Sequence, residues 1–148
     1  MKKNRLVFFN GAFVPEQEAK VSIYDSALMF GDMVFEMTRS FNKKQFLLES
    51  HIDRLLIGLK ILRIDLKYSK TQIIDFCYKT VEMNKKYMNP DDEDRLMIDV
   101  SRGLLGIYDS IPGMHKGPNL IIANFPLRWT VQGMGKLFDD GINGVVTS

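Results

Sequence analysis

The chain of 148 residues has little of several features that mark particular classes of protein. Cysteine occurs once, at Cys77, so no intrachain disulfide and no cysteine-based zinc cluster can form. The histidines are His51 and His115, and neither has a partner at metal-ligand spacing, so we expect no metal site. No stretch approaches the roughly twenty apolar residues of a membrane span, and the apolar run before Asn10 is too short for a signal peptide. These absences predict a reduced, cytoplasmic protein that is bound to no membrane.

The charge of the chain is nearly balanced, with a formal net charge of +2 at pH 7. Lysines and arginines are scattered, so we interpret them as solvated faces and not as a nucleic-acid surface. Hydrophobic residues make up 45% and charged residues 26% of the chain, which is ordinary for a globular domain. No region rich in proline, glycine or serine separates two halves, and the length by itself predicts one domain.

Common catalytic motifs are missing as well. The sequence has no Gly-x-Gly-x-x-Gly pattern, no Walker loop and no Gly-x-Ser-x-Gly elbow. Its serines, histidines and single cysteine form no recognisable catalytic triad either. A dinucleotide-binding, nucleoside triphosphate-binding or serine-hydrolase function is therefore not indicated.

Hydrophobic periodicity predicts strands, then helices, then strands again. Two apolar runs flank Asn10-Gly11, the strongest short signal for a hairpin. The other expected strands are residues 34–41, 45–48, 95–101 and 120–125, and the expected helices are residues 50–64 and 69–87, the second with the capping box Ser69 and Gln72. This order predicts an α+β two-layer sandwich, in which two helices cover one face of a mainly antiparallel sheet.

The first expected helix has an unusual beginning. Ser50 is a suitable N-cap with Asp53 three positions later, which puts Arg54 in the first turn. A cation there faces the positive end of the helix dipole and costs a few tenths of a kcal/mol, so we expect an anion in front of Arg54.

One face of the sheet combines apolar and cationic side chains. On alternating positions it carries Phe35, Met37 and Arg39 from one strand and Arg95, Met97 and Asp99 from another, if these strands are neighbours. This mixture suits a cofactor or substrate, and it is equally typical of a solvated face with extended arginines.

The motifs of the first third of the chain resemble one protein family. The segments "VSIYDSALMFGDMVFEMTRSFN" and "FLLESHIDRL" are similar to the amino-terminal domain of the class IV (fold-type IV) pyridoxal-phosphate aminotransferases. That family includes branched-chain aminotransferases, D-amino-acid transaminases and aminodeoxychorismate lyases. The resemblance implies pyridoxal 5'-phosphate as cofactor and Arg54 as the ligand of its phosphate. The alternative is a surface arginine paired with Asp53 or Glu49.

The resemblance also implies a set of substrate-binding residues and a homodimer. The matching positions are Phe30, Phe35, Met37, Arg39, Arg95, Met97 and Tyr108. Tyr108 belongs to a loop, residues 104–112, that resembles the family loop reaching the partner's active site. Ile107 and Asp109 stand where D-amino-acid transaminases have an Arg-x-His carboxylate trap, which argues against that branch. Most branched-chain enzymes have glycine where Met37 stands, so the resemblance leaves the substrate open.

The resemblance finally implies that the chain is part of a longer enzyme. It ends inside an apparent strand at residues 144–147, and the family's Schiff-base lysine lies beyond that strand, after Ser148. We therefore expect a smaller domain at 1–128, an interdomain segment and the first strand of a second domain at 129–148, and no catalytic residue and no activity in this chain alone.

Three functions are consistent with this interpretation. The first is an aminotransferase that moves an amino group from a small, branched-chain-like amino acid to a 2-oxo acid. The second is a lyase that acts on aminodeoxychorismate. The third, from another class, is a non-catalytic ligand-binding or oligomerisation domain.

Overall fold

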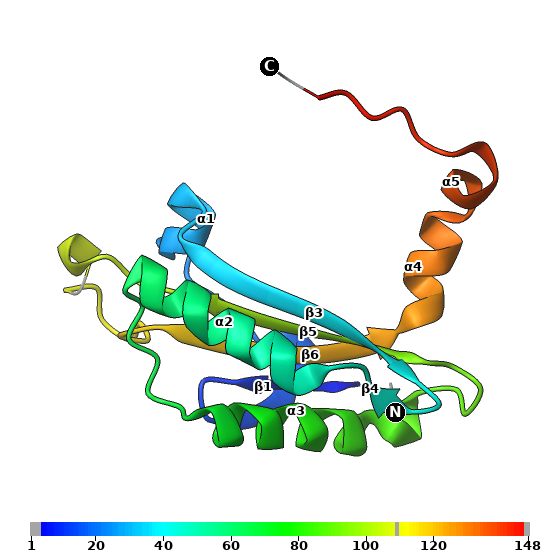
Figure 1. The fold of residues 1–148 in the computed structure, drawn as a ribbon. Helices are drawn as coiled ribbons and strands as arrows, with labels where there is room; N and C mark the ends of the chain where they lie inside the picture. Colours follow the sequence, from blue (N-terminus) through cyan, green and yellow to red (C-terminus); the bar gives the residue numbers. More distant parts are fainter. Residues whose placement is uncertain (1–3, 109, 147–148) are drawn as a thin grey trace.

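A six-stranded antiparallel sheet with two long helices on one face makes up most of the molecule (Figure 1). The computed structural model describes residues 4–108 and 110–146. The strand order is β2-β1-β6-β5-β3-β4, and every neighbouring pair is antiparallel. The strands are β1 (Leu6–Phe9), β2 (Ala12–Pro15), β3 (Met33–Phe41), β4 (Lys44–Gln45), β5 (Asp94–Ser101) and β6 (Asn119–Pro126). The predicted two-layer α+β sandwich is confirmed.

The first hairpin forms as the sequence predicts. Asn10 and Gly11 join β1 to β2 with φ angles of 49° and 99°. Two consecutive positive φ angles are what a tight hairpin turn of this kind needs, and Asn-Gly adopts them at low cost.

The two long helices, α2 (Leu48–Leu62) and α3 (Lys70–Asn84), pack their apolar sides on the sheet. The predicted capping box is present at α3: the Gln72 amide donates to the Ser69 hydroxyl, and the Ser69 amide donates to the Gln72 side chain. Side chains from both layers are completely buried between them, and these include Phe8, Ile52, Leu55, Ile73, Leu96, Ile98 and Ile122.

The predicted beginning of α2 is wrong. The helix begins at Leu48, and the strand expected at residues 45–48 ends at Gln45. Leu48 is buried in the core, and Leu47 takes a left-handed conformation, with φ 48°, to turn the chain into the helix. Burial of Leu48 thus outweighs the weaker preference for Ser50 as a cap. As a result, Arg54 lies in the second turn, beyond the helix dipole's main reach.

Short helices that the periodicity did not indicate complete the fold. They are α1 (Ser26–Phe30), α4 (Leu127–Gly133), α5 (Gly135–Asp140) and three 3-10 turns, η1 (Glu16–Glu18), η2 (Lys85–Tyr87) and η3 (Gly106–Tyr108). In Figure 1, α4 and α5 leave the end of β6 on the side of the sheet away from α3. No strand forms at residues 144–146, contrary to the prediction, and Thr147 lies outside the described residues. Among the helices described, none has the length and apolar character needed to cross a membrane.

Candidate functional site

The sheet face opposite α2 and α3 brings the predicted residues together. β3 and β5 are neighbours, and their register places Phe35 opposite Asp99, Met37 opposite Met97 and Arg39 opposite Arg95. Alternate residues of the same strands, such as Leu96 and Ile98, point into the core. Burial raises the pKa of the Asp99 carboxyl. The expectation that these two strands share one mixed face is confirmed.

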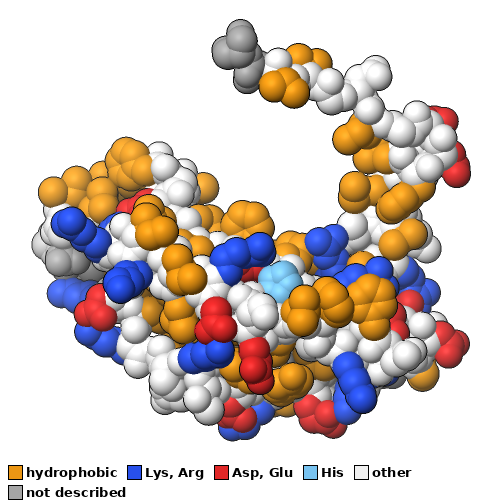
Figure 2. All heavy atoms as spheres, in the orientation of Figure 1, with side chains coloured by type: hydrophobic (Ala, Val, Ile, Leu, Met, Phe, Trp, Pro, Cys, Tyr) orange, Lys and Arg blue, Asp and Glu red, His pale blue; other side chains and the backbone are white. Residues whose placement is uncertain are grey.

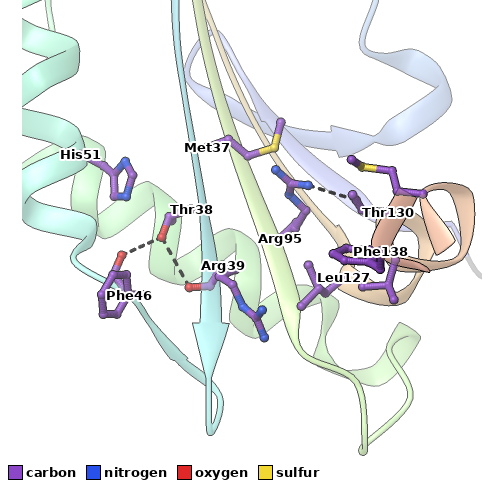
Figure 3. Close-up of a pocket in the computed structure, with 11 residues that line it drawn as sticks. Met37, Thr38, Arg39, Phe46, His51, Arg95, Leu127, Thr130 and Phe138 are labelled. Carbon is purple, nitrogen blue, oxygen red and sulfur yellow. Dashed lines mark hydrogen bonds between the residues drawn. The ribbon is translucent and has the colours of Figure 1, made fainter. Parts of the chain in front are cut away.

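A cleft of about 390 Å³ lies between this face and the helices α4 and α5 (Figure 3). The sheet contributes Met37, Arg39 and Arg95, and α4 and α5 contribute Thr130 and Phe138. No aspartate or glutamate lines it among the described residues, so its polar lining favours an anion. Figure 2 shows basic and apolar side chains gathered along the hollow between the sheet and the segment that carries α4 and α5.

A smaller hollow of about 170 Å³ lies beside the first two turns of α2. It is lined by Leu47, Ser50, His51 and Arg54. His51 also lines the large cleft, so the two spaces adjoin. A ligand with an anionic group in the hollow and an organic part in the cleft would therefore contact both.

Glu36 contacts two side chains of α2, those of His51 and Arg54. The Nε and Nη2 atoms of Arg54 donate to the two carboxylate oxygens of Glu36, the second at 2.7 Å, and Nδ1 of His51 lies 2.8 Å from Glu36 Oε2. The side chain of Glu36 is 5% exposed, whereas that of Arg54 is 70% exposed. The hydrogen bond from Arg54 keeps the pKa of Glu36 below its ordinary value despite burial, and His51 lowers it further. The same bond raises the pKa of Arg54.

The alternative expectation, that Arg54 pairs with Asp53 or Glu49, is wrong. Its partner is Glu36, while Asp53 pairs with Lys70 at 2.7 Å. A guanidinium carries five N–H donors, and Glu36 takes one on Nε and one on Nη2. The two donors of Nη1 and the second donor of Nη2 remain for an anion in the hollow.

The two arginines of the cleft are held differently. Arg39 lies 4.1 Å from the centre of the Phe41 ring, and its Nε donates to the Ser40 carbonyl oxygen at 3.3 Å. Arg95 donates from Nη1 to the Thr130 hydroxyl at 3.2 Å. Figure 3 shows Arg95 directed toward Thr130 and Arg39 directed away from it.

The remaining predicted residues lie outside the cleft. Phe35 and Met97 occupy the open sheet face, and Phe35 is largely exposed. Phe30 is exposed at the end of α1, and the ring of Tyr108 stacks on that of Tyr24 with centroids 4.9 Å apart. Substrate contact by these four residues stays a prediction.

Sequence reasoning missed Glu36 and His51 as members of the site. The sequence indicates only that His51 has no partner at metal-ligand spacing, although His51 and Arg54 are three residues apart and therefore share a helix face. The presence of Glu36 beside them depends on how β3 packs against α2, which no local pattern reveals.

Comparison with known proteins identifies relatives of this chain. Residues 33–139 match the family model for amino-transferase class IV. A putative branched-chain-amino-acid aminotransferase of Methanocaldococcus jannaschii is 42% identical over 78 residues, which is 53% of this chain and 27% of the relative. A D-alanine aminotransferase of Staphylococcus aureus (strain N315) is 32% identical over 115 residues, which is 78% of this chain and 39% of the relative.

Solved structures give the same result. The branched-chain aminotransferase of Escherichia coli aligns with a TM-score of 0.69 at 26% identity, over 85% of this chain and 42% of that one. A second branched-chain aminotransferase, from T.th. and complexed with N-(5'-phosphopyridoxyl)-L-glutamate, aligns with a TM-score of 0.67 at 26% identity, over 83% of this chain and 40% of that one. The chain thus spans less than half the length of these relatives. Their names include both branched-chain and D-alanine enzymes, and Asp109, which was expected to distinguish the two, lies outside the described residues.

Proposed function

The chain belongs to the class IV aminotransferase family, and from that premise we propose that it forms the cofactor-phosphate and substrate side of a pyridoxal-phosphate enzyme. The proposed reaction moves an amino group from a small, branched-chain-like amino acid to a 2-oxo acid. The observation that carries the proposal is the Arg54 guanidinium, which Glu36 holds at one edge while its other donors remain available in a hollow beside the cleft.

The residues of the hollow fit a phosphate group. An arginine with donors on two nitrogens can bind two phosphate oxygens at once, which is the strongest geometry for this recognition. His51 and the hydroxyl of Ser50 line the same space, at the amino-terminal turns of a long helix. Pyridoxal phosphate, when bound, supplies the electron sink for the reaction.

The side chains of this domain have distinct proposed roles. Arg54 binds the phosphate, and Glu36 and His51 keep its guanidinium in place. Arg39 and Arg95 orient an anionic group of the substrate, and Met37, with Phe35 and Met97 beside it, excludes water from the reacting end. Such positioning in a site without water strengthens each of these electrostatic contacts.

The lysine that forms the Schiff base is proposed to come from outside this chain. No lysine lines the cleft or the hollow among residues 4–108 and 110–146. We take residues 1–128 as the smaller domain and residues 129–148 as the connection to the segment that carries the lysine, so the chain alone would not transaminate. A cytoplasmic homodimer, with the loop of Tyr108 at the partner's site, completes the proposal.

The first test is cofactor capture by the longest natural protein that contains this chain. It would be mixed with pyridoxal phosphate and reduced with borohydride, and its intact mass and visible spectrum would be measured. We expect an adduct on a lysine after Ser148 that is weakened in Arg54→Ala. Lys60→Ala, which removes a cation from the same helix outside the hollow, should leave the adduct unchanged. Equal capture by wild type and Arg54→Ala would refute the role of Arg54.

A D-amino-acid donor is the second candidate, because the D-alanine aminotransferase of Staphylococcus aureus matches over 78% of this chain. Parallel assays with L-leucine and D-alanine, each with 2-oxoglutarate, would separate the two. Formation of L-glutamate from L-leucine supports the branched-chain assignment, and turnover of D-alanine alone overturns it.

A further inference from the structure

One hydrogen bond joins the open sheet face to the helix on the far side of the cleft. Nη1 of Arg95, from β5, donates to the hydroxyl of Thr130, from α4, at 3.2 Å (Figure 3). Both residues line the cleft of about 390 Å³. Arg95 forms no ion pair with any described residue, so its charge stays uncompensated on the cleft wall.

The position of Thr130 is set by the contacts of the two residues before it, Arg128 and Trp129. Arg128 donates from Nε to the Asp92 carboxylate at 2.6 Å. The ring of Trp129 stacks on Phe125 with centroids 6.2 Å apart, and the guanidinium of Arg5 lies 4.6 Å from the Trp129 ring. Arg128, Trp129 and Thr130 therefore each contact a residue in or next to the sheet. These contacts fix the position of the Thr130 hydroxyl before any ligand binds.

We propose that Thr130 is a positioning residue, which holds the Arg95 guanidinium toward the carboxylate at the far end of an acidic ligand in the cleft. The inference rests on the proposed function and deepens it, because it assigns the anion-recognising arginine a partner that fixes its direction. Thr130 occupies one of the five N–H donors of Arg95, and the four others stay available for a carboxylate. An arginine held in this way loses less side-chain entropy on binding than a free one.

Arg39 has no such partner on α4 among the described residues. Its guanidinium lies over the Phe41 ring, and its Nε bonds the neighbouring Ser40 carbonyl, so its direction is set by its own strand. The contact between Arg95 and Thr130 instead crosses the cleft. A change at Thr130 should therefore alter the recognition of a distal carboxylate and leave the recognition of an apolar chain of the same length unaffected.

The test compares two acids of equal length, glutarate and valerate, which differ by one carboxylate. Binding would be measured by titration calorimetry and by the fluorescence of Trp129, the one tryptophan of the sequence. No cofactor is needed. We expect wild type to prefer glutarate, and Thr130→Val to lose about five- to tenfold in glutarate affinity with valerate affinity unchanged. Thr130→Ser, which keeps the hydroxyl, should retain the preference.

Two variants serve as references for the positioning role. Arg95→Met should abolish the preference for glutarate, and Gln132→Ala, on α4 but outside the cleft lining, should preserve it. If Thr130→Val weakens both acids equally, Thr130 only anchors α4 and the inference is wrong. It is also wrong if wild type does not distinguish the two acids. Failure of the proposed function would instead appear as absence of cofactor capture, with the Thr130-dependent preference intact.

Discussion

At the scale of single residues, Glu36 is the most constrained group of the site. It is a nearly buried carboxylate that satisfies Arg54 and His51 at once, and those bonds hold its pKa below the ordinary value of 4.5. In the proposed function, this carboxylate does not contact the phosphate, because Glu36 does not line the hollow. Its proposed role is to fix which donors of Arg54 remain available, as the groups behind a binding residue do in many sites.

Glu36→Gln should therefore weaken the binding of inorganic phosphate and of pyridoxal phosphate. The amide keeps the shape of the side chain but loses the charge, and one charge-assisted hydrogen bond corresponds to about tenfold in affinity. Equilibrium dialysis against phosphate measures the effect. Glu49→Gln, an exposed change in the first turn of the same helix, is the matched control and should bind as wild type. If Glu36→Gln binds phosphate with unchanged affinity, Arg54 does not depend on its contact with the Glu36 carboxylate.

The same carboxylate gives a defined dependence of stability on pH. Because the pKa of Glu36 is lowered in the folded state, the unfolded chain binds more protons in the acid range. Its stabilising contribution is fully present above about pH 4.5 and is lost as the pH falls through the lower folded pKa. The difference in free energy of unfolding between wild type and Glu36→Gln, from urea titrations at pH 6 and pH 3, should shrink toward the lower pH. A difference that is constant with pH would contradict the ion pair.

At the scale of secondary-structure elements, the structure shows which parts of the fold local sequence patterns determine. The Asn10-Gly11 hairpin and the Ser69 cap of α3 depend on neighbouring residues alone, and both form as predicted. The beginning of α2 depends on burying Leu48 against the sheet, which outweighs local capping. The short helix α4 has no apolar period of its own and is held by contacts to distant residues, such as that of Arg128 with Asp92.

The candidate site, like the fold, was predictable where it depends on local sequence patterns and not where it depends on packing. Alternation placed Arg39 and Arg95 on one face, because side chains of a strand alternate in any context. The contacts of Arg54 with Glu36 and of Arg95 with Thr130 join elements far apart in the sequence. No pattern of spacing specifies such contacts before the packing is known.

Leu47 offers a test of the entry into α2. A leucine with φ 48° is in the left-handed region, which costs roughly 1–2 kcal/mol for most side chains and less for asparagine. Leu47→Asn should raise the free energy of unfolding by about 1 kcal/mol, because the exposed leucine side chain contributes little to the core. Leu47→Val, with a branched β-carbon, should lower it. Thermal unfolding of both variants measures the effect, and the opposite order would show that Leu47 is not strained.

At the scale of the whole molecule, Arg102 ties the two layers together at the end opposite α4. Its guanidinium binds both carboxylate oxygens of Asp32, before β3, and the carbonyl oxygens of Leu62 and Arg63, at the end of α2. It thereby satisfies carbonyls that the end of a helix leaves without partners. The hydrogen bond with Asp32 also raises the pKa of Arg102, so its side chain keeps its positive charge at neutral pH.

Arg102→Lys should destabilise the protein although it preserves the charge. An ammonium cannot reproduce the planar fork that reaches Asp32 and both carbonyl groups, and losing two of these bonds costs about 2 kcal/mol. Arg128→Lys changes an arginine that, among the described residues, pairs with Asp92 alone and bonds no helix-end carbonyl, so it should cost less than about 1 kcal/mol. Urea unfolding of the two variants at neutral pH gives the comparison. If both lysine variants unfold alike, the layers are held by the hydrophobic core alone, and Arg102 is not what connects the end of α2 to the sheet.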